Sequence, residues 1–309
     1  MRSARRCSCH DSGGTMGWEP LKRAMRGFDE FVARQDVRIA SDAAINPQLA
    51  IVRQFLDDHE SMGGEGAADK WVKNDFKLFY DAVIAVYRLT DVVVTLCDSP
   101  AHLRSRLTTV LSGPLTQDWS PQPAKDILYE LEIAAALRKA GFDVALREPD
   151  VVVSGGELTE EIGLACKYPS SEAQIHAHIT KGYRQIAKQD LRGCVVLGLD
   201  LIIHPSTFDS SPQFVDLSQS VRHPRDVANE VVADAMSPLV ANRSKDYPSE
   251  RPLDGAILTF GTWGIFGQPR GFASLMAWSV QCLTQNPIRG DLELIVRRMK
   301  ELNTELKSL

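Results

Sequence analysis

Three charged residues stand where the sequence predicts that two strands and a helix meet. Asp150 opens one apolar segment, and Lys167 ends another, directly after Ala165 and Cys166. Glu130 lies in a helical segment among apolar residues, where a carboxylate is costly unless it is paired or binds a metal. Mg²⁺ prefers such oxygen ligands, and a nearby lysine can orient a water or stabilise negative charge. This set suits metal-assisted hydrolysis of a phosphodiester bond.

A helix and a hairpin must position these residues. The apolar spacing predicts a helix over 124–140, ended by Gly141 in the left-handed conformation. Three strands follow, with 154–156 as a hairpin turn; they are expected over 143–146, 150–153 and 163–167. Since side chains alternate along a strand, Ala165 and Lys167 share a face, and Cys166 can offer the site only its backbone carbonyl.

The segment YELEIAAALRKAGFDVALREPDVVVSGGELTEEIGLACKYPSS resembles the core of the PD-(D/E)XK nuclease superfamily, the fold of many restriction enzymes and junction resolvases. In that family a helix glutamate precedes a Gly-Phe turn, Pro-Asp opens a hairpin, and an acid-x-Lys triplet closes it. Glu130, Asp150 and Lys167 match these positions, and the resemblance extends over 125–200.

The resemblance implies a mixed central sheet flanked by helices, a restriction-endonuclease-like α/β core. It also implies a nuclease that hydrolyses phosphodiester bonds with Mg²⁺ or Mn²⁺. The metal ligands would be Asp150, Glu130 and the backbone carbonyl of Cys166. Lys167 would be the catalytic lysine, acting with Asp150 and Glu130.

Ala165 stands where the family has the second acid of its motif. Glu130 could supply the missing oxygen ligand, and Glu161 could do so if the strand extended back to it. Without a replacement, the same fold would be a catalytically inactive module that binds nucleic acid or a protein partner. Glu130 would be exposed if the buried face of its helix were centred on Leu131 and Ala135. Glu132 lies on the neighbouring face and is expected to be a surface carboxylate, but it is kept in reserve because the phase of the helix is open.

Simpler interpretations of the other two residues stay open. Asp150 could be an ordinary turn residue after proline, and Lys167 a solvated strand end. Besides an active nuclease and an inactive module of the same fold, the protein could be another α/β protein whose hairpin resembles that of the nucleases by chance.

The helix expected over 172–189 carries further polar candidates. Gln185 is expected to face the site. Lys181, Arg184 and Lys188 form a basic stripe that suits nucleic-acid phosphates, although a solvated helix face explains it equally well.

The remaining chain divides into a helical part and an α/β part. Residues 1–15 suggest a disordered leader, 16–118 a helical N-terminal domain, and 119–309 the α/β domain that contains the motif. A proline-rich stretch lies between the two parts. Beyond the hairpin the sequence predicts a buried strand over 194–203, a strand over 255–261, and helices over 226–240, 272–283 and 291–306.

The composition indicates which partners and which cellular compartment suit the protein. The net charge is −5 and the isoelectric point about 5.8, so nucleic acid would have to bind through a local basic surface. DNA is favoured over RNA, and an oligomer is compatible with the sequence. Six scattered cysteines favour a reducing cytoplasm, and no apolar stretch is long enough to span a membrane.

Overall fold

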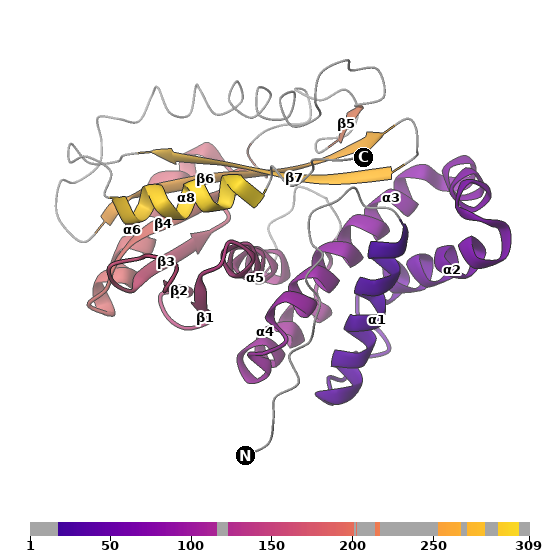
Figure 1. Cartoon of the computed structure of the whole chain (residues 1–309), viewed down its shortest axis with the longest axis horizontal. Coiled ribbons are helices and arrows are strands. Elements are labelled where there is room, and N and C mark those ends of the chain that lie inside the picture. The colour runs from indigo at the N-terminus through magenta and orange to yellow at the C-terminus, as the bar shows by residue number, and fades with distance from the viewer. Residues whose placement is uncertain are drawn as a thin grey trace.

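The protein combines a group of N-terminal helices with a mixed sheet (Figure 1). The computed structural model describes residues 18–115, 123–200, 202, 214–216, 253–266, 271–281 and 290–302. The expected leader over 1–15, part of the proline-rich stretch and the helix expected over 226–240 lie outside these residues. None of the described helices is both long and apolar enough to cross a membrane.

Four helices form the N-terminal part, which is helical as the sequence predicts. They are α1 (Trp18–Arg34), α2 (Asn46–Met62), α3 (Gly64–Leu96) and α4 (Pro100–Ser112). The long helix α3 is central: α1 and α2 pack against it, and so does the later helix α5 (Pro123–Lys139). The predicted end of α5 is confirmed, because Gly141 has φ +90° and the Phe142 amide donates to the Leu137 carbonyl at 3.1 Å.

The predicted hairpin is also present. Strand β1 (Asp143–Ala145) pairs antiparallel with β2 (Val151–Ser154), which pairs antiparallel with β3 (Ile162–Lys167). Helix α6 (Glu172–Lys188) then returns the chain, so that β4 (Arg192–Gly198) runs parallel to β3. The β2–β3 connection is longer than the turn predicted at 154–156, and Gly155, Gly156 and Glu157 all have positive φ there.

The sheet continues on the far side of β4. Strand β6 (Leu253–Phe266) pairs parallel with β4 and with the short β5 (Phe214–Asp216), and β7 (Gly271–Gln281) pairs antiparallel with β6. The described strands form one seven-stranded sheet in the order β1-β2-β3-β4-β6-β5, with β7 beside β6. Helix α8 (Gly290–Leu302) packs on β7, β6 and α5.

The helix predicted over 272–283 is wrong, because residues 272–281 belong to strand β7. Alanine, leucine and methionine in the segment favour a helix when they are considered locally. Instead, β7 pairs continuously with β6, from Ala256–Gln281 to Phe266–Gly271, and this pairing satisfies the backbone groups along one edge of β7.

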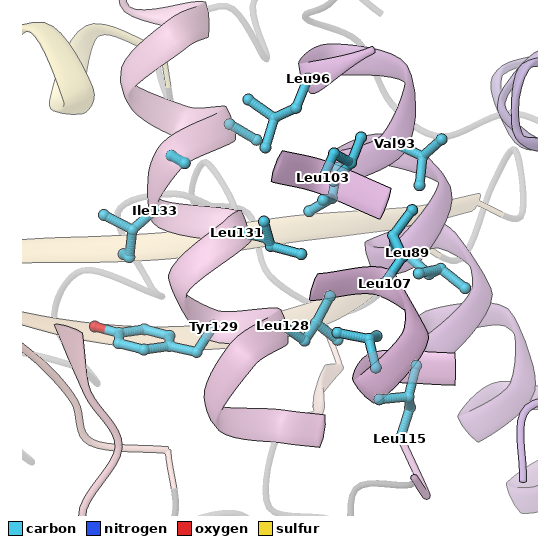
Figure 2. Close-up of a cluster of buried hydrophobic side chains, with 14 of the residues drawn as sticks. Leu89, Val93, Leu96, Leu103, Leu107, Leu115, Leu128, Tyr129, Leu131 and Ile133 are labelled. Carbon is cyan, nitrogen blue, oxygen red and sulfur yellow. The ribbon is translucent and has the colours of Figure 1, made fainter. Parts of the chain in front are cut away.

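One hydrophobic core joins the two parts of the chain, and α5 lies in the middle of it. Figure 2 shows Leu128 and Leu131 of α5 facing Leu89, Leu103 and Leu107 of the N-terminal helices, whereas Ile133 and Tyr129 point from the other side of α5. The Tyr129 hydroxyl lies 2.7 Å from the Thr259 hydroxyl of β6. The proline-rich junction therefore divides the sequence but does not divide the core.

Candidate active site

Asp150 and Lys167 form the centre of the candidate site. Val151 pairs with Leu164 in the hairpin, so Asp150 is opposite Ala165, as the sequence predicts. One carboxylate oxygen of Asp150, Oδ2, accepts hydrogen bonds from the Cys166 amide and from Lys167 Nζ, both at 2.8 Å. Asp150 thereby bridges the ends of the two strands. Burial raises the pKa of its carboxyl, and the Lys167 charge opposes that effect.

Lys167 is almost completely buried, with 9% of its side chain exposed. Its ammonium group also donates to the Cys166 carbonyl at 2.7 Å. The carbonyl predicted as a metal ligand is therefore bound to the lysine in this arrangement. The alternative of a solvated strand end does not apply to Lys167, because a buried lysine held by a carboxylate is a structured part of the site.

Glu130 lies on helix α5, which packs on β2 and β3. Its side chain is 18% exposed and forms an ion pair with Arg106 of α4. The other arm of the same guanidinium donates to the backbone carbonyl of Asp150 at 3.2 Å. The structure thus links Glu130 to the Asp150 segment through Arg106, which the sequence did not predict.

The charged groups of the site also affect one another's pKa. Burial and the Asp150 charge raise the pKa of Glu130 to about 7, although Arg106 and Lys167 act in the opposite direction. Such pKa shifts in a group of charged residues are typical of functional sites, and structural ion pairs produce them as well.

Asp126 is a further carboxylate that the sequence prediction missed. It lies one helical turn before Glu130, and burial raises its pKa while Lys167 and Lys181 oppose the shift. The spacing of four residues from Glu130 was the available signal. Arg106 had no such signal, since only the packing of α4 against α5 brings it to the site.

Helix α6 contributes polar groups from one of its faces. Gln185 donates to the Pro149 carbonyl at 3.3 Å, while its side-chain oxygen is buried without a hydrogen-bond partner. His178 Nδ1 is likewise buried without a partner, and burial, together with Lys167 and Lys181, lowers the pKa of this histidine. Lys181, Arg184 and Lys188 are exposed along α6.

Two acids kept as alternative ligands, Glu161 and Glu132, have other partners. Glu161 forms an ion pair with Arg147 at 2.7 Å, and about half of its side chain is exposed. Glu132 is not a surface residue: its side chain is 10% exposed and binds Arg88 of α3, with one contact at 2.7 Å. Neither is in contact with the Asp150 and Lys167 pair among the described residues.

The donor atoms fit a hard cation in type. Asp150 Oδ1 and Glu130 Oε1 have no hydrogen-bond partner in the described part of the chain, and carboxylate oxygens are the ligands that Mg²⁺ and Mn²⁺ prefer. As the side chains stand, no three histidine, cysteine, aspartate or glutamate residues of the described chain form a metal-binding group by themselves. A bound ion would therefore complete its shell with water or substrate oxygens, as Mg²⁺ commonly does.

Comparisons of the chain with protein-family models, with curated proteins and with solved structures found no match. The residues of the site are therefore the only basis for assigning a function to this protein.

Proposed function

We propose that this protein is a metal-dependent nuclease of the cytoplasm, with a restriction-endonuclease-like core and nucleic acid as its substrate. The observation that carries the proposal is the buried ion pair between Asp150 and Lys167 at the junction of β2 and β3, with Glu130 linked to the same segment. A buried ion pair of this kind contributes little to stability on average, and we therefore assign it a chemical role.

Asp150 and Glu130 would hold Mg²⁺ or Mn²⁺ through their unbonded carboxylate oxygens. A bound ion would polarise a phosphate group and make a water molecule more acidic. Lys167 has three N–H donors, and Asp150 and Cys166 accept two of its hydrogen bonds. The third donor remains for the attacking water or for a phosphate oxygen, whose negative charge grows as the phosphodiester is cleaved.

The basic residues of α6 support the proposal that the substrate is a polyanion such as nucleic acid. Lys181, Arg184 and Lys188 are exposed on a protein whose net charge is −5, so they offer a local surface for phosphates. We favour DNA over RNA as the substrate.

The second candidate function is a catalytically inactive module on the same fold. Two observations favour it: the Cys166 carbonyl is bound to Lys167, and Ala165 supplies no oxygen. Such a module would bind nucleic acid or a protein partner without hydrolysis.

A cleavage assay separates the two functions. Plasmid, single-stranded DNA and RNA are incubated with the wild-type protein over a range of Mg²⁺ and Mn²⁺ concentrations. We expect metal-dependent cleavage that Asp150→Asn and Lys167→Met each reduce by about 100-fold or more. Glu132→Gln is the matched control, since Glu132 also lies on α5 and pairs with an arginine outside the site. Equal cleavage by the wild type and both site variants would reject the nuclease, and substrate binding without cleavage would support the inactive module.

A further inference from the structure

Arg106 is the residue of the N-terminal helices that reaches the candidate site. One arm of its guanidinium pairs with Glu130 Oε2, and the other donates to the Asp150 carbonyl. The guanidinium therefore joins helix α5 to the segment that carries Asp150. Among the described residues, none of α1–α3 forms a hydrogen bond or an ion pair with Glu130 or Asp150, so this connection belongs to α4.

The position of Arg106 is fixed by packing on both sides of it. Leu103, Leu107 and Val110 of α4 are completely buried, and α4 packs directly on α5. The Arg106 side chain is itself 21% exposed. Its guanidinium is planar and presents its donors in a rigid fork, so it can hold two acceptors in a fixed relation.

We propose that Arg106 is a positioning residue of the active site, which holds Glu130 toward Asp150 so that the N-terminal helices complete the metal-binding arrangement. This inference rests on the proposed function. It assigns a task to the helical region: α4 supplies a contact that the α/β part cannot provide for itself.

The hydrogen bonds of Arg106 indicate that it positions Glu130 and does not block the place of the cation. Arg106 occupies one oxygen of Glu130 and a backbone carbonyl of Asp150, whereas Glu130 Oε1 and Asp150 Oδ1 have no hydrogen-bond partner in the described chain. Groups that orient a metal ligand in this way typically contribute 10- to 100-fold to metal affinity. If Arg106 instead blocked the cation position, removing it would strengthen metal binding.

Mn²⁺ alone, titrated by calorimetry into the full-length protein, tests the inference without relying on activity. We expect Arg106→Met to weaken Mn²⁺ binding by about 10- to 100-fold. Arg106→Lys keeps the positive charge but lacks the planar guanidinium that binds two acceptors, so its Mn²⁺ affinity should stay close to that of Arg106→Met. Arg88→Met is the matched control, because Arg88 also pairs with an α5 glutamate, away from the site; it should bind Mn²⁺ like the wild type.

The outcomes separate this inference from the proposed function. Wild-type Mn²⁺ binding that Asp150→Asn abolishes, but that neither Arg106 variant changes, would overturn the role of Arg106 alone. Tighter binding by Arg106→Met would overturn it in favour of obstruction. If the wild type has no Mn²⁺ binding that Asp150→Asn removes, the proposed function fails and the inference fails with it. Should Arg106→Met not fold, wild-type affinity in Arg106→Lys would still be decisive against positioning.

Discussion

Ala165 is a packed position and not an open place for a ligand. Its side chain is completely buried under α6. A Cβ atom placed on Gly182 of that helix would lie 3.1 Å from the Ala165 Cβ. The close approach of α6 to the sheet thus leaves no room for a carboxylate at position 165, and any replacement acid must come from another element.

Restoring the motif acid should therefore damage the protein. We expect Ala165→Asp to reduce the free energy of unfolding by at least about 2 kcal/mol, because it buries a charge and displaces α6. Urea denaturation measures the change, and Ala177→Asp on the exposed face of the same helix should have a much smaller effect. A stable Ala165→Asp variant with increased metal-dependent cleavage would contradict this account.

Glu130 should make stability depend on pH in a defined direction. Its pKa rises from 4.5 to about 7 in the folded protein, so the folded state binds the proton more tightly than the unfolded chain. The resulting stability is fully present below pH 4.5 and is lost as the pH rises through about 7. From about pH 5 to about pH 8 the loss should be roughly 2 to 3 kcal/mol.

Glu130→Gln provides the measurement, because glutamine does not titrate. Urea denaturation of the wild type and the variant across this range should show the extra loss in the wild type only. A pH dependence unchanged by Glu130→Gln would show that Glu130 does not titrate in this window. Metal binding requires the ionised carboxylate, so cleavage should increase over the same pH range.

At the scale of elements, the contact of α6 with the sheet decides the shape of the site. A Cβ added to Gly182 would meet Val195 Cγ2 at 2.8 Å, and Val195 is completely buried in β4. Glycine at this position therefore lets α6 approach β3 and β4 closely. That approach places His178 and Gln185 near the residues at the ends of β2 and β3.

Gly182→Ala tests this packing. Alanine favours the helix by about 1 kcal/mol relative to glycine, but overpacking typically costs 1 to 3 kcal/mol, so we expect a net loss of about 1 kcal/mol. Gly290→Ala is the control, since a Cβ there meets nothing within 4 Å. Thermal unfolding compares the two, and a stabilised Gly182→Ala variant would show that α6 is free to move outward.

At the scale of the whole molecule, α5 makes the two parts of the chain interdependent. Its apolar residues belong to a core that continues into both the N-terminal helices and the sheet. Its charged residues bind the N-terminal helices as well: Lys139 pairs with Asp91 at 2.6 Å, and Glu132 pairs with Arg88. If α5 separated from either the N-terminal helices or the sheet, the apolar residues that it covers there would be exposed to water.

The two parts should consequently unfold together. Leu131 is completely buried on the side of α5 that faces the N-terminal helices (Figure 2), and Leu131→Ala should cost about 2 to 5 kcal/mol. Native-state hydrogen exchange should show that loss equally in peptides of α3 and of β4. Protection that falls in α3 while β4 keeps its wild-type value would indicate two independent units.

Local spacing along the sequence was sufficient for much of the site. Helix α5 with its glycine stop, the β2–β3 hairpin and the position of Asp150 beside 165–167 all follow from patterns within a few residues. Such patterns predict helices and strands well, because the repeat of apolar residues and the turn-forming glycines depend only on neighbouring residues. The roles of Asp150, Glu130 and Lys167 in catalysis stay predictions.

Contacts between distant elements decided the rest. The pairing of β7 with β6 overrode a helical preference, and the packing of α4 on α5 brought Arg106 to Glu130 across 24 residues of sequence. The closeness of α6 decided that Ala165 is buried. Periodicity describes which face of a segment is apolar, but it does not specify which other segment covers that face; that choice depends on the free energy of the whole packed core.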